Sequence, residues 1–346
     1  MNLELFIDKK ITIKQALKIL DITAKKILFV IEDNRLLGTI TDGDIRRWIL
    51  KNGDLNDTVN NIMNKKPITL NLNNKSLAKK IIKENNIEAI PIVDDENKVI
   101  EIVFFNENNK LNNTKEITNP VIIMAGGKGT RLYPYTKILP KPLIPIGDYS
   151  ISERIIERFY KHGCKNFYFT LNYKKNMIKA YFDELEKDYN INYIEEEKFL
   201  GTGGSLHLLK DKINETFFLS NCDILVEADY LDILNYHKNN KNKITMVTSI
   251  KDYKIPYGII KLNNNGEVIS TEEKPELTYL VNTGFYILEP EVLNDIPENE
   301  FFHITDLINK YLKEGKKVGT YPIAESSWLD MGEVKEMDRM IERLGL

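Results

Sequence analysis

Cysteine is scarce in this chain of 346 residues, which contains only Cys164 and Cys222. Two cysteines cannot form the disulfide framework of a small secreted domain, and they suit a reducing compartment. The first ten residues, MNLELFIDKK, show no basic segment followed by an apolar one, so we expect no signal peptide. We therefore predict a cytoplasmic protein.

Long apolar runs and an excess of one charge are also absent. No apolar run approaches the ~20 residues that a helix needs to cross a bilayer. The net charge is −3 with both signs interspersed, which argues against nucleic acid or a membrane as a partner. With 42% hydrophobic and 29% charged residues, the chain can build ordinary globular cores, and its length predicts about two domains.

An internal repeat covers residues 1–105. Each copy has a helix pattern, an apolar strand, a polar turn and a second strand, and the second copy follows about 60 residues after the first. Thr12 and Ser76 are candidate caps for the helices that open the two copies. The strands are expected at Ile27–Ile31, Leu36–Ile40, Ile90–Val93 and Val99–Phe104.

This repeat resembles the cystathionine-β-synthase-type (CBS) pair. In that family a G-x-x-T-x-x-D segment after the second strand holds the ribose and phosphate of an adenosine nucleotide. The first copy matches it with Gly38, Thr41 and Asp44. The aligned positions in the second copy are Glu101, Phe104 and Glu107. The resemblance therefore implies one regulatory nucleotide site, at Thr41 and Asp44. A module that only dimerises the protein or braces the second domain stays equally open.

Composition and pattern suggest the domain boundaries. We assign the two CBS copies to residues 1–56 and 57–106. The polar stretch 107–119 contains few large apolar residues and is expected to be a linker. From residue 120 to residue 346, strand and helix patterns alternate, which predicts one α/β domain.

The α/β domain opens with the stretch VIIMAGGKGTRLYPYTKILPKPLIPI. An apolar run, Val121–Met124, predicts a buried parallel strand. The glycines that follow are Gly126, Gly127 and Gly129. Glycine lets backbone N–H groups approach an anion closely, and Arg131 and Lys141 bracket the next turn, so the stretch predicts a phosphate site. It fits neither the Walker loop, because Gly129 follows Lys128, nor the dinucleotide fingerprint, because Leu132 occupies the third glycine position.

Residues 126–142 resemble the signature of the sugar-1-phosphate nucleotidyltransferases, G-G-x-G-T-R-L-x-P-x-T…P-K-P, nearly position for position. These enzymes join a sugar-1-phosphate to the α-phosphorus of a nucleoside triphosphate and release pyrophosphate. The attacking phosphate is largely dianionic near pH 7 because its second pKa is about 6. The reaction therefore needs cations and alignment and no general base. The implied fold is a Rossmann-like α/β domain with a mixed, mostly parallel sheet, preceded by an α+β CBS pair.

The resemblance assigns catalytic roles to Arg131, Lys141 and Asp223. Arg131 would grip the β- and γ-phosphates with its planar fork, and Lys141 would neutralise charge at the α-phosphate. Asp223, in the segment NCD, and Asp330, in WLDMG, resemble the two carboxylates that hold Mg²⁺. Taken alone, each aspartate would more often be a helix cap or a turn residue than a metal ligand.

The resemblance also implies binding residues for the two substrates. A second glycine loop, Leu200–Gly204, resembles the loop that covers the base and sugar, and Asn172 and Glu197 are candidates to face the base. The nucleotide-binding set is Ala125, Gly126, Gly127, Gly129, Thr130, Asn172, Glu197, Gly201 and Thr202. On the acceptor side, Lys274 would bind the sugar phosphate and Glu273 a ring hydroxyl. The acceptor set, from a Y-G turn, an E-K-P element and an N-T-G strand, is Gly258, Glu273, Lys274, Asn282 and Thr283.

The domain order resembles bacterial guanylyltransferases of surface-glycan pathways. Examples act on glucosamine 1-phosphate, in legionaminic acid biosynthesis, or on a heptose or mannose 1-phosphate. We therefore expect GTP as the donor, a sugar-1-phosphate as the acceptor and a homo-oligomer that dimerises through the CBS pair. UTP or dTTP with a hexose-1-phosphate is the main alternative, and a CTP-dependent transferase is a further one. A nucleotide-sensing regulator without turnover is an alternative of a different class.

Overall fold

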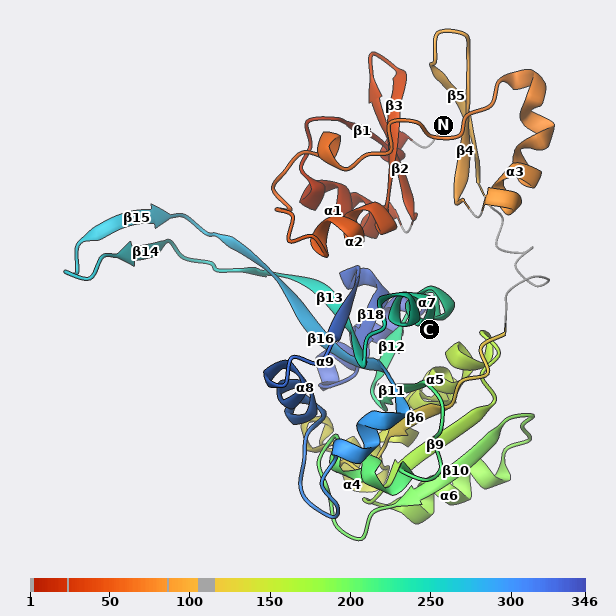
Figure 1. Ribbon diagram of the computed structural model, residues 1–346, viewed down its shortest axis with the longest axis vertical. Helices are drawn as coiled ribbons and strands as arrows, with labels where there is room; N and C mark the ends of the chain where they lie inside the picture. The colour runs from red at the N-terminus through yellow and green to blue at the C-terminus, as the bar shows by residue number, and fades with distance from the viewer. Residues whose placement is uncertain (1–2, 24, 86, 105–115) are drawn as a thin grey trace. The chain divides into compact units, whose positions relative to one another are not determined.

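The computed structural model describes residues 3–23, 25–85, 87–104 and 116–346. The chain separates into two compact units, residues 1–114 and 115–346, both drawn in Figure 1. Of the expected linker, residues 107–115 lie outside the described residues. Ile117 is buried, and its N–H donates to the carbonyl of His162 at 2.9 Å, so the end of the expected linker packs on the second unit. No helix in the described ranges is long and apolar enough to cross a membrane.

The first unit contains the two copies of the repeat. Thr12 caps the first helix reciprocally with Gln15: the Thr12 N–H donates to Gln15 Oε1 at 2.8 Å, and the Gln15 N–H donates to Thr12 Oγ1 at 3.1 Å. One sheet has the order β1-β2-β3, and β4 and β5 form a second, two-stranded sheet. The elements are β1 (Phe6–Asp8), α1 (Ile13–Thr23), β2 (Ile27–Glu32), β3 (Arg35–Thr41), α2 (Asp42–Ile49), α3 (Ala78–Asn85), β4 (Ala89–Val93) and β5 (Val99–Phe104).

The expected cap at Ser76 is wrong. Ser76 lies inside a 3-10 helix, Leu72–Leu77, which precedes α3. Asn71 caps that turn, because its side chain accepts a hydrogen bond from the backbone N–H of Asn74 at 3.1 Å. The helical segment therefore begins about one turn earlier than the apolar pattern indicates.

The second unit is built on a seven-stranded sheet in the order β10-β9-β6-β11-β16-β13-β17. Neighbours from β10 to β11 are parallel, as are β13 and β17, whereas β16 runs antiparallel to both β11 and β13. This is the mixed, mostly parallel α/β sheet that the sequence predicts. The sheet strands are β6 (Val121–Met124), β9 (Asn166–Leu171), β10 (Asn190–Glu195), β11 (Phe217–Asn221), β13 (Ile244–Lys254), β16 (Glu276–Leu288) and β17 (Val318–Ile323).

Helices and short ribbons complete the second unit. The helices are α4 (Tyr135–Ile138), α5 (Ile151–Tyr160), α6 (Lys175–Glu184), α7 (Tyr230–Asn240), α8 (Ile304–Lys313) and α9 (Val334–Arg343). The short strands are β7 (Pro145–Ile146), β8 (Tyr149–Ser150), β12 (Ile224–Val226), β14 (Ile259–Leu262), β15 (Val268–Glu272) and β18 (Trp328–Asp330).

The sheet is buried on both faces. Along β6, Val121 and Ile123 belong to one hydrophobic core, while Ile122 and Met124 belong to the core on the opposite face. A continuous apolar run is the expected pattern for a strand covered on both sides. The carboxyl ends of β6, β9 and β11 then share one edge of the sheet, which is where ligands bind in open α/β folds.

Candidate active site

The glycine turn after β6 is held between neighbouring strands and the loop that follows it. The Ala125 N–H donates to the Thr170 carbonyl at 3.0 Å. Gly129 has a φ of 64°, and a side chain there would meet Thr136 at 2.9 Å and Lys141 at 3.1 Å. Thr136 Oγ1 in turn donates to the Gly129 carbonyl at 3.0 Å. Glycine at this position therefore lets the loop fold back and brings Lys141 beside the turn.

Lys141 forms an ion pair with Asp223, which follows β11. Both side chains are nearly nine-tenths buried. Burial alone would lower the pKa of Lys141, but the Asp223 carboxylate and its acidic neighbours, Asp330 among them, together outweigh burial, and the pKa lies above its ordinary value. The lysine is therefore held charged in a mostly dry environment, where it is a strong electrostatic partner for a phosphate.

Asp330 lies next to Asp223 because β12 and β18 pair with Ile224 opposite Asp330. The Met331 N–H also donates to the Asp223 carbonyl at 2.8 Å. Burial and repulsion from the Asp223 carboxylate raise the pKa of Asp330, while Lys141 and Arg131 act in the opposite direction. The four charged residues of the predicted catalytic and metal set therefore share one site. Arg131 is its exposed member.

The two carboxylates fit a divalent cation that also binds phosphates. Among the residues that the structure describes, no group of three or more His, Cys, Asp or Glu could hold a metal alone. Two close carboxylates, which repel each other, instead provide a partial set of hard oxygen ligands, to which phosphate oxygens and water must be added. Mg²⁺ is typically bound in this way, through one or two carboxylates plus substrate phosphates.

Cys222, between β11 and Asp223, is a buried thiol. Its exposed fraction is 6%, and burial, reinforced by the Asp223 carboxylate, raises its pKa to about 12. A thiol that stays protonated is a poor nucleophile, so the side chain fills space beside the charged cluster.

The second glycine loop is anchored by a buried glutamate that the sequence analysis passed over. Glu196 is 3% exposed, and its Oε2 accepts a hydrogen bond from the Leu200 N–H at 3.0 Å. Its Oε1 lies against Gly126, where an added side chain would meet it at 2.7 Å. Asn172 is here as well, because its Nδ2 donates to the Glu196 carbonyl at 3.2 Å. Glu197, the candidate from sequence, is exposed.

Gly201 and Thr202 pack against the start of α8. A side chain at Gly201, whose φ is 84°, would meet the carbonyl of Phe302 at 2.6 Å. Thr202 Oγ1 lies 3.2 Å from His303 Nδ1 and accepts a hydrogen bond from the Ile304 N–H at 3.3 Å. The loop is therefore fixed to the body of the domain at both positions. Gly127 and Thr130 lie on the first loop, half-buried and exposed respectively.

The predicted acceptor residues fall into two places. Asn282 and Thr283 lie at the bulged part of β16; the Thr283 hydroxyl donates to the Val247 carbonyl at 2.7 Å, and Asn282 Nδ2 donates to the Tyr286 hydroxyl at 2.7 Å. Gly284, next to them, packs against Asn221 at the end of β11. This piece therefore adjoins the charged cluster.

The other acceptor residues lie on the ribbon that continues from β13 and β16. Glu273 approaches Gly258 so closely that a side chain at Gly258 would meet it at 2.8 Å. Lys274 Nζ is 3.9 Å from Glu273 Oε1, and the two side chains are 58% and 75% exposed. The structure thus groups Gly258, Glu273 and Lys274 with one another on an exposed ribbon.

In the first unit, Thr41 and Asp44 cap α2. Asp44 Oδ2 accepts hydrogen bonds from the Thr41 N–H at 2.8 Å and from the Thr41 hydroxyl at 2.7 Å, and Asp44 also pairs with Arg47. Gly38 is closely approached by the Asn64 carbonyl, 2.6 Å from where its side chain would begin. In the second copy Glu101 pairs with a lysine at 2.7 Å, Phe104 ends β5, and Glu107 lies outside the described residues.

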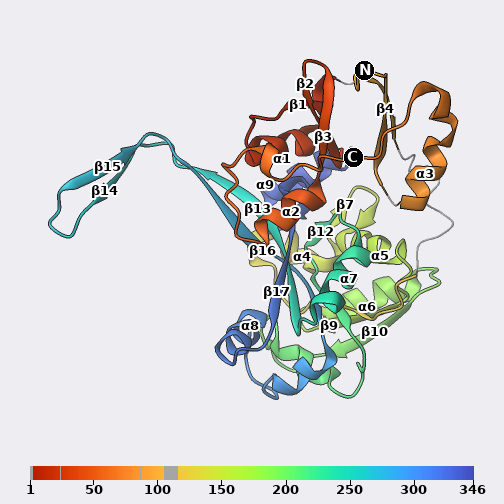
Figure 2. The same cartoon turned by 45° about the horizontal axis from the view of Figure 1, so that its top comes forward.

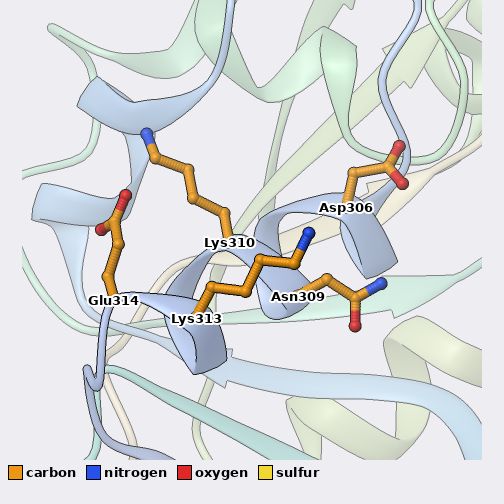
Figure 3. Close-up of a pocket in the computed structure, with 5 residues that line it drawn as sticks. All are labelled: Asp306, Asn309, Lys310, Lys313 and Glu314. Carbon is orange, nitrogen blue, oxygen red and sulfur yellow. The ribbon is translucent and has the colours of Figure 1, made fainter.

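A separate hollow lies on the surface of α8 (Figure 3). It has a volume of about 440 Å³ and contains none of the predicted site residues. Its lining comes from one helix: Asp306, Asn309, Lys310, Lys313 and Glu314.

The fold and the charged cluster define an α/β domain that gathers a glycine turn, two cations and two carboxylates at the carboxyl ends of its strands. The chain belongs to the nucleotidyl transferase family, which matches residues 120–344, and CBS domains match residues 1–51 and 59–104.

Curated relatives resemble the second unit. The bifunctional protein GlmU of Methanococcus maripaludis is 34% identical over 220 residues, covering 61% of this chain and 51% of that protein. The mannose-1-phosphate guanyltransferase of Saccharomyces cerevisiae is 31% identical over 224 residues, covering 62% of each chain. The UTP–glucose-1-phosphate uridylyltransferase of a Synechocystis species is 27% identical, covering 62% of this chain and 60% of that protein. The chain thus spans between half and two thirds of these relatives.

The crystal structure of HddC from Yersinia pseudotuberculosis has the same fold. It superposes with a TM-score of 0.53 at 23% identity, covering 66% of this chain and all of that protein.

Proposed function

We propose that this protein transfers a nucleoside monophosphate from a nucleoside triphosphate to a sugar-1-phosphate and releases pyrophosphate. The observation that carries the proposal is the buried Lys141–Asp223 ion pair beside Asp330, at the mouth of the glycine turn. Family membership and the activities for which the yeast and Synechocystis relatives are named support it.

In the proposed reaction an oxygen of the sugar phosphate attacks the α-phosphorus, and the bond from that phosphorus to the β-phosphate oxygen breaks. The attacking group carries its own negative charge, so the chain's residues need only bind, align and neutralise. Backbone N–H groups of Gly126, Gly127 and Gly129 would cradle the triphosphate, and exposed Arg131 would grip its outer phosphates. Lys141 would move from Asp223 toward the α-phosphate, where charge builds up.

Mg²⁺ would be held by Asp223 and Asp330, and when bound it would neutralise phosphate charge as a Lewis acid. Gly258, Glu273, Lys274, Asn282 and Thr283 are the proposed acceptor residues. Because the Thr283 hydroxyl donates a hydrogen bond to the backbone of β13, we propose that its side chain fixes the position of this strand segment beside the acceptor.

We propose GTP as the donor and a GDP-sugar as the product. Two observations support this preference: the order of the two units along the chain, and the guanyltransferase activity for which the yeast relative is named. The Synechocystis relative favours the alternative, UTP with a hexose-1-phosphate. We propose further that the CBS pair dimerises the chain and binds a regulatory nucleotide at Thr41 and Asp44.

A matrix assay tests the proposal. Each of four nucleoside triphosphates is combined with several sugar-1-phosphates and Mg²⁺, and pyrophosphate release is measured. The proposal predicts release that requires both substrates and is fastest with GTP. If pyrophosphate release is fastest with UTP, the proposed type of reaction stands, but the donor is UTP and not GTP. No release from any pair would favour the nucleotide-sensing regulator.

A further inference from the structure

The ribbon formed by the ends of β13 and β16 together with β14 and β15, residues 251–280, projects beyond the sheet. We call it the arm. Figures 1 and 2 both show it running away from the rest of the second unit. Large apolar side chains along it are 42–74% exposed: Tyr253, Tyr257, Ile260, Leu262, Val268, Ile269, Tyr279 and Leu280.

The tip of the arm has one apolar face. Ile260 lies opposite Thr271, and Leu262 lies opposite Val268. Cross-strand partners share a face, so Ile260 and Leu262 lie on the same face as Thr271 and Val268. The register shifts between Lys261 and Leu262, where the ladder skips Ile269. The opposite face carries the pair Lys261 and Ser270 and the pair Ile259 and Glu272. The tip therefore has one mainly apolar face, and Ile260, Leu262, Val268 and Ile269 are each more than half exposed.

A two-stranded ribbon with an uncovered apolar face is marginally stable in water and exposes two unpaired strand edges. The arm is also not placed as a lid over the charged cluster. Lys254 pairs with Glu276, the Ile255 N–H donates to the Pro275 carbonyl at 3.0 Å, and Ile259 pairs with Glu272. This nearly continuous ladder keeps the tip in line with β13 and β16, so the cover for its apolar face must come from elsewhere.

We propose that the arm docks on a second copy of this chain. Half-exposed side chains of this size expose on the order of 100 Å² each, so the eight residues, counted over both faces of the arm, expose roughly 800 Å² per chain, which is comparable with the area that each partner buries in a standard interface. The arm carries both signs of charge: Lys254 lies opposite Glu276, and Lys261 on β14 faces the strand that carries Glu272. A two-fold pairing therefore does not oppose two surfaces of one charge, and two-fold closure is the commonest symmetry of such assemblies.

Docking has a consequence for the acceptor side of the site, which rests on the proposed function. Glu273 and Lys274 lie about midway along the arm, between the β13/β16 ladder and the β14/β15 ladder, and are mostly exposed. A partner that packs on the arm restricts this middle segment and so orders these two side chains for the sugar phosphate. The second copy would thus raise the affinity for the acceptor and leave that for the triphosphate unchanged.

The test uses the full-length chain with the double substitution Ile260→Glu and Val268→Glu. Both positions are solvent-exposed, so the added charges should destabilise the proposed interface without disturbing the hydrophobic core. The matched control is Leu312→Glu, which charges an equally exposed apolar residue on α8. Sedimentation velocity is measured over a range of protein concentrations. We propose the arm contact as separate from the CBS contact, so we expect the mass of the arm variant to be half that of the wild type and of the control: a dimer instead of a tetramer if both contacts form, and a monomer instead of a dimer if only the arm does. A monomeric wild type, or equal masses for all three chains, overturns the proposal.

Cross-linking places the contact. Thr271→Cys introduces an exposed thiol on the apolar face, while Cys164 and Cys222 are buried. A short bismaleimide should join two Thr271→Cys chains, and it should leave Lys313→Cys, on α8, uncoupled. Equal coupling of both variants, or of neither, counts against the arm. If nucleotidyl transfer is observed, the arm variant should also raise the KM for the sugar phosphate at least several-fold. If no transfer is observed, the masses and cross-links still decide the assembly.

Discussion

Lys141 and Asp223, 82 residues apart in the chain, form a buried ion pair that ties the glycine-rich loop to the end of β11. The pair places a held cation and a carboxylate where the donor loop meets the second acid, Asp330. In the proposed reaction the lysine would leave this carboxylate for a phosphate, and the freed carboxylate would be available to hold Mg²⁺. On this proposal the ion pair is the resting form of the cluster.

Replacing Lys141 with methionine should lower kcat by about 10²- to 10³-fold, because removal of one preorganised donor to a developing charge has effects of that size. It should also lower the unfolding free energy by about 3–5 kcal/mol, since it leaves a buried carboxylate unpaired. Pyrophosphate release and chemical denaturation measure the two effects. Lys137→Met, an exposed lysine in the same loop, is the control. Turnover within threefold of the wild type would remove Lys141 from the mechanism.

Asp223→Ala and Asp330→Ala should each abolish turnover and leave the protein folded. Both acids are expected to hold the metal rather than to pack the core. Circular dichroism checks the fold, and pyrophosphate release at saturating Mg²⁺ checks the activity. Asp211→Ala changes an exposed acid elsewhere in the domain and should have no effect. Near-normal turnover in either site variant would refute the role of that acid.

Lys174, which is not part of the glycine-rich loop after β6, should help to hold that loop in place. Its Nζ donates to the carbonyls of Lys137 and Ile138, both at 2.6 Å, which are among the last acceptors of α4. Lys174→Met should raise the KM for the triphosphate up to about tenfold, the equivalent of one charged hydrogen bond, with little change in kcat. Its neighbour Lys175 pairs with Glu195 instead, so Lys175→Met is the matched control. If both variants have the same KM for the triphosphate, Lys174 has no role in positioning the donor loop.

The buried His237 should make stability fall in mild acid. Its Nδ1 lies 2.8 Å from Thr245 Oγ1 and its Nε2 lies 3.0 Å from Glu289 Oε1. Burial, which outweighs the attraction of Glu289, lowers the pKa of His237 below its ordinary 6.5. The unfolded chain therefore binds the proton first, and stability that is present above about pH 6.5 is lost as the pH falls below it. The melting temperature of His237→Asn should fall less between pH 6.5 and pH 5 than that of the wild type. Parallel curves would show that His237 does not control this range.

Asp44→Ala should weaken nucleotide binding to the first unit at least tenfold and should lower the stability of that unit by about 1 kcal/mol, because Asp44 also completes a helix cap. Calorimetry with adenosine and guanosine nucleotides measures the binding. Thr41→Ser keeps the hydroxyl and is the conservative control. A wild-type protein that binds no nucleotide would leave only the dimerising or bracing role for the CBS pair.

Much of the architecture follows from local patterns in the sequence. The apolar run Val121–Met124 could only be satisfied by a strand covered on both faces, and it is one. Glu196 shows what was missed. It lies two residues after the buried Ile194, and the alternation of a strand, continued one step past its end, turns Glu196 inward and Glu197 outward. Residue type cannot tell the three consecutive glutamates apart, but the inward–outward alternation of strand side chains distinguishes the buried one from its neighbours.

Other features depend on contacts that a linear pattern does not encode. The segment NNNG at residues 263–266 is typical of a hairpin turn, yet nothing local indicates that β14 and β15 extend beyond the sheet. The pairing of Lys141 with Asp223 likewise depends on how two loops meet across the sheet edge. Only the resemblance to a known signature, not spacing, placed them in one site.

The measurement that tests the central claim most directly is product formation followed by ³¹P NMR. The wild-type chain is incubated with GTP, a sugar-1-phosphate and Mg²⁺, beside Lys141→Met under the same conditions. We predict the paired phosphorus resonances of a nucleoside diphosphate sugar, together with the pyrophosphate resonance, in the wild type. Neither product should appear in the variant over the same time. Wild-type spectra that retain both substrates across the nucleotide and sugar panel, or equal product from the two chains, would contradict the account.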